Sequence, residues 1–142
     1  MKTDDQIKTA LYHAIKYSPL GDLISGTVTK RDRPAESDKE DVCISILSNR
    51  GGGQIQRVIV NINIYVRDIY NPLSRQWEAD DRRLSELCTL SQFLFDLYDQ
   101  WFHVVGRESY QQCMEAGVIF PDSHTEHIIN NQLLIEIINE TY

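Results

Sequence analysis

Two histidines, His124 and His127, stand close to Asp122 and Glu126 and form the group of side chains most like a metal site in this sequence. Imidazole and carboxylate groups are ordinary zinc ligands, so the group could serve a small metal-dependent hydrolase or nuclease. However, the histidines lie three residues apart in a turn rather than four apart on a helix, and no distant third ligand stands out. We therefore expect a solvated turn and keep the metal enzyme, built on Asp122, His124 and His127, as the less favoured alternative.

The run Gly51-Gly52-Gly53 is a second candidate, because glycine-rich loops can hold phosphate groups. A phosphate-binding loop of the P-loop type needs G-x-x-x-x-G-K-[ST] followed by a helix whose N-terminus faces the anion. Here an apolar segment typical of a strand follows instead. We therefore expect the tip of a hairpin, where glycine accepts positive φ without steric penalty.

Nucleophilic chemistry has no clear candidate. The three cysteines, Cys43, Cys88 and Cys113, are odd in number, widely spaced and set in apolar patterns, which indicates buried free thiols in a reducing compartment. No G-x-S-x-G segment is present, and the charged run Asp80–Arg83 is explained by the start of a helix. We expect no catalytic residue, no cofactor and no bound metal, and hence a protein that is not an enzyme.

Length and composition indicate one soluble domain, residues 1–142. The chain is 42% apolar and 25% charged, with a formal net charge of −7. That charge argues against binding nucleic acid through its phosphates. The apolar stretches are far shorter than the roughly 20 residues of a membrane-spanning helix, and the polar N-terminus does not resemble an export signal. We expect neither a membrane span nor export.

Hydrophobic periodicity predicts the elements that must position these residues. Thr3 and Gln6 form a capping box for a helix that stops at 18–21, and the segments 24–33, 42–47 and 58–66 are expected to be extended. The segments 42–47 and 58–66 form a hairpin with a long tip, residues 48–57. A helix is expected over 72–105, and a second hairpin is formed by 108–120 and 127–142 around the turn 121–126.

This order predicts an α+β domain. We expect a mostly antiparallel sheet of about four to five strands, with the N-terminal helix and one long helix packed on one face. A helix that links two strands could also leave one parallel pairing.

Two features suggest a binding surface. The second face of the main hairpin, with Ile59 and Tyr65, is neutral and too apolar to be simply left in water. A segment of basic residues (30–33) precedes a segment of acidic ones (36–41), which suits a loop that meets a charged neighbour. The candidate interface residues are Lys30, Arg31, Arg33, Arg50, Gly51, Gly52, Gly53, Gln54, Asn61, Asn63 and Tyr65.

The order and texture of these segments resemble the small tail-terminator or tail-completion proteins of long-tailed bacteriophages and prophages. The segments that carry the resemblance are the helix "DDQIKTALYHAIKYS", the hairpin "DVCISIL…GGGQIQRVIVNINIYV", the helix "DDRRLSELCTLSQFLFDLYDQW" and the closing strand "NNQLLIEIIN". A related neck or minor tail component would share this order.

The resemblance implies a ring, typically a hexamer, that caps the tail tube, stops its growth and joins it to the head connector. The implied partners are copies of the chain itself, tail-tube proteins and head-connector proteins, while DNA passes through without specific binding. The implied location is the bacterial cytoplasm during assembly and then the virion tail or neck. A cytoplasmic adaptor that binds one protein partner through the same sheet face is the other alternative.

Overall fold

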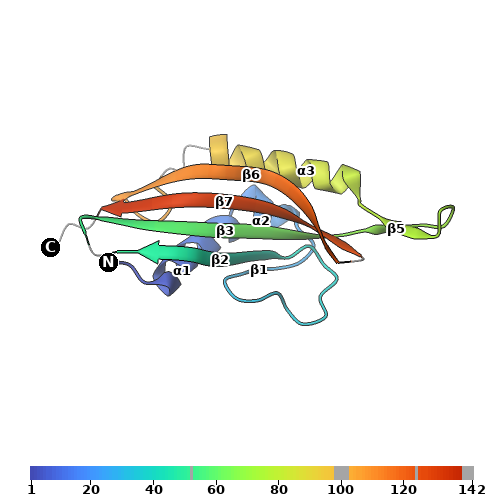
Figure 1. The fold of residues 1–142 in the computed structure, drawn as a ribbon, viewed down its shortest axis with the longest axis horizontal. Helices are drawn as coiled ribbons and strands as arrows, with labels where there is room; N and C mark the ends of the chain where they lie inside the picture. Colours follow the sequence, from blue (N-terminus) through green and yellow to red (C-terminus); the bar gives the residue numbers. More distant parts are fainter. Residues whose placement is uncertain (52, 98–102, 124, 139–142) are drawn as a thin grey trace.

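The computed structural model describes residues 1–51, 53–97, 103–123 and 125–138 of the chain (Figure 1). For residues 97 and 123 it describes the backbone but not the side chain. Three helices and a π-helical turn, η1, are combined with a long-stranded sheet and a short two-stranded one. The elements in order are α1 (Asp4–Lys16), α2 (Pro19–Leu23), β1 (Val28–Thr29), β2 (Val42–Arg50), β3 (Ile55–Arg67), β4 (Ile69–Asn71), β5 (Gln76–Glu78), α3 (Asp81–Gln92), η1 (Phe93–Leu97), β6 (Ser109–Ser123) and β7 (Glu126–Ile138).

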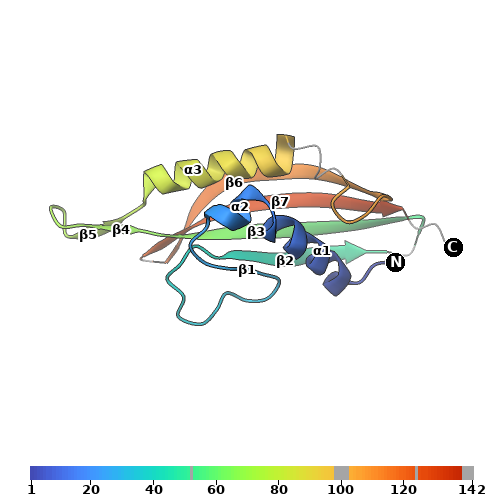
Figure 2. The ribbon, with the colours of Figure 1, turned by 180° about the vertical axis from the view of Figure 1, so that it is seen from behind.

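The main sheet has five strands in the order β1-β2-β3-β7-β6. All neighbours are antiparallel except β1 and β2, which are parallel over two residues. The two views from opposite sides show α1, α2 and α3 on one face of this sheet, with no helix in front of the other (Figures 1 and 2). The α+β class and the mostly antiparallel sheet are confirmed. The single parallel pair, however, joins strands linked by a loop rather than by a helix.

The core lies between the sheet and the helices, where the predicted periodicities meet. Alternate residues of β3, from Val58 to Val66, are at most 2% exposed, so the period of two places them on the covered face. Ile7, Leu11 and Ile15 of α1 face them and are fully buried. Each such side chain contributes about 1.5–3 kcal/mol on burial. The capping box of Thr3 and Gln6 at the start of α1 is confirmed.

The helix expected over 72–105 is wrong in its first part. Residues 69–78 form instead a small hairpin, β4–β5, that projects from the end of β3 as an arm (Figure 1). Asn71 and Pro72 open its turn: the Asn71 side chain accepts a hydrogen bond from the Leu73 amide, and Arg75 adopts φ 57°. The helix starts at Asp81, after the N-cap Asp80. Its expected continuation through 98–102 lies outside the described residues, and a turn occupies 103–105.

Both turns of the long hairpins are shorter than expected. Arg50 still pairs with Arg57, so the first tip is residues 51–54 rather than 48–57. Gly51 and Gly53 are not among the described glycines with positive φ, whereas Gly51 approaches the side chain of Met1 closely. In the second hairpin the strands run to Ser123 and from Glu126. α1 ends before the predicted stop at 18–21, but a short second helix, α2, begins within that stop, at Pro19.

Within the described residues no helix is both long and apolar enough to cross a membrane. The three cysteines are free and half-buried, not fully buried. Within the segment expected to be helical, Leu90 packs against the core while Phe93 is exposed.

Candidate interaction surface on the open face of the sheet

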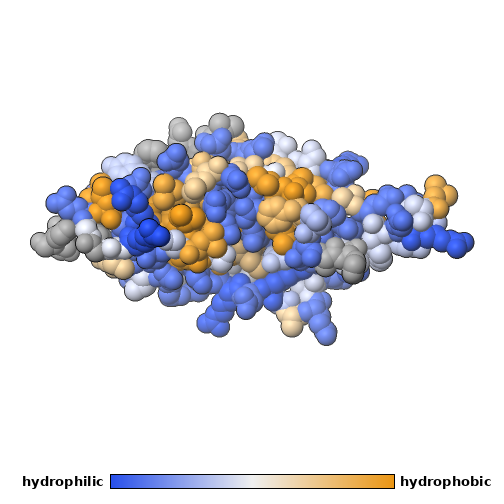
Figure 3. Space-filling model, viewed as in Figure 1, coloured by the Kyte–Doolittle hydropathy of each residue, from blue (hydrophilic) through white to orange (hydrophobic). Residues whose placement is uncertain are grey.

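The helix-free side of the main sheet, which we call the open face, is built by residues at alternate positions of β2, β3, β7 and β6. The registers place them in rows across the sheet. Figure 3 views this face and shows two apolar areas with a polar area between them. The successive rows are Tyr110, Glu136, Arg57 and Arg50; Gln112, Leu134, Ile59 and Ser48; Glu115, Gln132, Asn61 and Ser45; Val118, Asn130, Asn63 and Cys43; and Phe120, Ile128 and Tyr65.

Apolar side chains gather at both ends of the open face. Near the hairpin tip they are Leu47, Ile59, Met114 and Leu134, which we call the tip zone; Leu47 is 55% exposed and Met114 is 48% exposed. Near the arm they are Tyr65, Val118, Phe120 and Ile128, which we call the arm zone. Exposed apolar area of this kind is typical of a surface that binds another protein.

Between the zones runs a polar band, made of Ser45, Asn61, Asn63, Glu115, Asn130 and Gln132. Asn130 donates a hydrogen bond of 2.6 Å to the side-chain oxygen of Asn63. The side-chain oxygen of Asn61, by contrast, is buried and has no partner among the described residues. A buried acceptor without a donor costs about 1–3 kcal/mol.

A network of charged side chains lies at the edge of the open face, beside the arm zone. Arg33 donates to Asp41 at 2.8 Å and to Glu126 at 2.5 Å, and its guanidinium lies 4.6 Å from the centre of the Tyr65 ring. Burial disfavours the charged form of Asp41, but hydrogen bonds from Arg33, Ser37 and the Thr27 amide together outweigh it and lower the pKa of Asp41. Arg33 thus joins three segments of the chain that lie far apart in the sequence.

The same charges explain part of the basic segment 30–33. Lys30 pairs with Asp5 at 3.0 Å, and Arg33 pairs with the acidic end of its own loop. These basic residues therefore pair with acidic residues of the same chain, whether or not an external partner also binds there.

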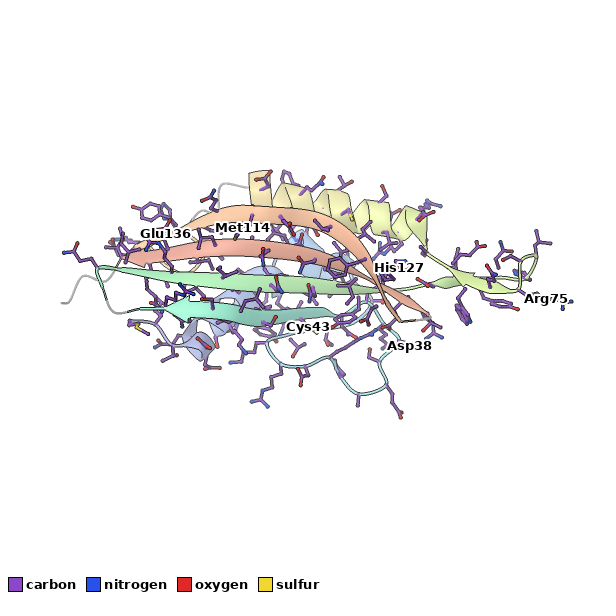
Figure 4. The ribbon with its side chains drawn as sticks, in the orientation of Figure 1. Asp38, Cys43, Arg75, Met114, His127 and Glu136 are labelled. Carbon is purple, nitrogen blue, oxygen red and sulfur yellow. The ribbon has the colours of Figure 1, made fainter. Side chains whose placement is uncertain are left out.

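Five of the predicted interface residues come together at a hollow of about 190 Å³ beside the open face. Cys43 lies in it (Figure 4), and burial raises the pKa of this thiol to about 11, so that it is protonated at neutral pH. A protonated thiol is a poor nucleophile, and the carboxylate of Asp32, which also lines the hollow, raises the pKa of Cys43 further. The predicted residues at the hollow are Lys30, Arg31, Arg33, Asn63 and Tyr65.

The other predicted residues lie elsewhere. Asn61 is at the centre of the polar band, whereas Arg50, Gly51, Gly53 and Gln54 lie at or beside the far tip of the β2–β3 hairpin. Gly52 lies outside the described residues. The structure therefore divides the candidate set between the hollow, the band and the tip.

The expectation that His127 lies in a solvated turn is wrong. It is a residue of β7, and its Nδ1 lies 2.6 Å from Oδ1 of the buried Asp68, just before the arm begins (Figure 4). His124 lies outside the described residues. In the part of the chain that the structure describes, no group of three or more His, Cys, Asp or Glu residues could hold a metal ion.

Sequence reasoning missed the arm itself. Four of its apolar residues are exposed: Ile69 and Tyr70 by 51% each, Trp77 by 42% and Leu73 by 96%. The signal that could have revealed it is the Asn71-Pro72 turn between two short apolar segments.

A scan against models of known protein families finds none that matches this chain, and a search of curated proteins finds no significant match.

Proposed function

We propose that this chain is a non-enzymatic structural protein of bacteriophage or prophage tail assembly. Copies of it associate into a ring that caps or completes the tail tube and joins it to the head connector. The observation that carries the proposal is the open face, a sheet surface with two exposed apolar zones and a polar band between them. Such a surface suits a protein neighbour better than water.

The shape and charge of the molecule support a ring in particular. The chain is elongated, and its arm projects at one end of the long axis while the tip zone lies toward the other (Figure 1). Two different surfaces at opposite ends permit head-to-tail contacts, which close into a ring where the rotation allows. With a net charge of −7 the wall of such a ring would repel DNA and let it pass.

Sedimentation velocity and negative-stain electron microscopy test this proposal, on the purified protein alone and with growing tail tubes. We expect concentration-dependent rings, or rings that form only on tube ends, and tubes that stop growing when the protein is added. A protein that stays monomeric in both settings and leaves tube growth unchanged would contradict the proposal. A one-to-one complex with a protein unrelated to phage tails would instead favour the adaptor.

A further inference from the structure

We infer that the β4–β5 arm of one copy docks on the open face of a second copy, over its tip zone and polar band. The inference rests on the proposed self-assembly and specifies the contact that produces it. Both halves of this contact are on the same chain, and in a single copy both are unoccupied.

The arm has the properties of a segment that needs a partner. A two-stranded hairpin alone is only marginally stable in water. Tyr70 and Trp77 face each other across the arm with ring centres 5.5 Å apart, and Arg67 lies 5.4 Å from the Trp77 ring. Beyond these contacts the arm extends away from the body, and Leu73 at its turn is 96% exposed (Figures 1 and 2). Docking would bury this apolar surface.

The arm cannot reach the tip zone of its own chain. It continues β3 beyond Arg67, whereas Ile59 and Leu134 pair near the other end of that strand. Figure 4 shows Arg75 at the far end of the arm and Glu136 toward the opposite end of the molecule. In a second copy placed beyond the arm in the same orientation, by contrast, the tip zone is the part nearest to the arm. The contact is therefore between two copies and runs head to tail.

Charge complementarity identifies a second copy as the occupant. Arg75, at the turn of the arm, takes part in no ion pair among the described residues. Glu115 of the polar band is an exposed acid, likewise without an ion pair in the described part of the chain. Docking would bring the Arg75 cation to Glu115. Pro72 and Leu73, beside Arg75, would cover the apolar tip zone.

The dimensions agree with this placement. From Ile69 to Leu73 the arm spans five residues, and the four steps between them, at about 3.3 Å each, give about 13 Å. The tip zone and polar band extend along β7 from Leu134 to Asn130, which is also five residues. An arm laid along the face would therefore cover both.

Charge reversal tests the docking. In Arg75→Glu and in Glu115→Arg the like charges would repel, and we expect each to raise the dissociation constant of the assembly about tenfold or more. The double variant, with both charges exchanged, restores most of the affinity. Both side chains are exposed, so the fold of the single chain is unaffected, as circular dichroism will show. Arg82→Glu is the matched control, because this arginine is 92% exposed on α3, on the other side of the sheet.

Disulfide cross-linking gives the second measurement. With the three native cysteines replaced by alanine, the pair Leu73→Cys and Leu134→Cys should link different copies under mild oxidation. The control pair Leu73→Cys and Tyr17→Cys should not, because Tyr17, although more exposed than Leu134, belongs to the helical side.

The outcomes separate the inference from the proposed function. Rings that form equally well in every charge variant and never link through the first cysteine pair would overturn arm docking and leave the ring intact. Cross-linked dimers or open chains without rings would support arm docking and contradict the ring. A wild-type chain that stays monomeric both alone and with growing tail tubes, together with no cross-link through the first cysteine pair, would overturn both.

Discussion

At the scale of single residues, the centre of the charge network is Asp41. Its side chain is only 2% exposed, and it accepts hydrogen bonds from Arg33, Ser37 and the Thr27 amide. We predict that Asp41→Asn lowers the free energy of unfolding by about 3 kcal/mol, because Arg33 would lose a buried partner. Urea denaturation measures the change. Asp38→Asn is the control, since its pair with Arg67 is exposed, and it should cost less than about 1 kcal/mol.

The lowered pKa of Asp41 also sets a pH dependence. Below its unfolded value of 3.8 the unfolded chain takes up a proton at this site before the folded chain does. Stability from this group is therefore present above pH 3.8 and is lost as the pH falls through the lower, folded pKa. The Asp41→Asn variant should lack this part of the acid-induced loss, and an identical acid profile in both proteins would contradict the assignment.

The half-buried thiols give a chemical prediction. Burial raises the pKa of Cys43 and that of Cys113 to about 11, from 9.0. At pH 8 their thiolate fraction is then about a hundredfold lower than in the unfolded chain, so alkylation by iodoacetamide should slow by about that factor. Mass spectrometry of the peptides can compare native protein with protein in urea. Equal rates for Cys43 in both conditions would refute the shift and reopen a role as nucleophile.

At the scale of elements, one buried amide joins three of them. Asn131 of β7 is fully buried; it accepts a hydrogen bond from the Gly117 amide and donates to the Ile62 carbonyl and the Ser91 hydroxyl. It thus connects the irregular part of β6 to β3 and α3. Gly117 at φ 71° brings the β6 backbone close to Cys88 of α3.

We predict that Asn131→Leu, a change of similar size, lowers the free energy of unfolding by about 2 kcal/mol, because the Gly117 amide and Ile62 carbonyl lose a partner. Ser91→Ala is the milder comparison and should cost under about 1 kcal/mol, since it removes a single long hydrogen bond of 3.4 Å. Urea denaturation measures both. If the leucine variant proved as stable as the wild type, the bridging role would be wrong.

The elements that the sequence predicts well are those whose burial is one-sided. The alternation in β2 and β3 and the spacing of Ile7, Leu11 and Ile15 report directly which side faces the core. The arm was missed because both of its faces are exposed, which leaves no periodic signal beyond the Asn71-Pro72 turn.

The candidate site was predictable only in part, for a related reason. Asn61, Asn63 and Tyr65 share one face of a strand, and the period of two shows this. That Arg33 reaches Tyr65 depends on how the loop between β1 and β2 folds back on β3, and that β6 adds Val118 and Phe120 to the same surface depends on the strand order β3-β7-β6. Pairing between segments so distant in the chain cannot be read from local patterns. Tail assembly stays a prediction.

At the scale of the whole molecule, an elongated subunit has helices on one side of its sheet and an open face on the other (Figures 1 and 2). Most apolar side chains of the helical side pack into the core, with Tyr17, Leu23 and Phe93 as exposed exceptions, whereas the open face keeps two apolar zones at the surface (Figure 3). Association through the open face therefore removes apolar area from water without rearranging the core.

Sedimentation velocity of the wild type beside Leu134→Arg tests this most directly. Leu134 lies in the tip zone, half-buried, so a charge there should block association while leaving the unfolding curve nearly unchanged. Tyr17→Arg, an equally large change on the helical side, is the control. We predict that the wild type and Tyr17→Arg assemble with rising concentration and that Leu134→Arg remains monomeric. Assembly of Leu134→Arg at the same concentrations as the wild type would contradict the account.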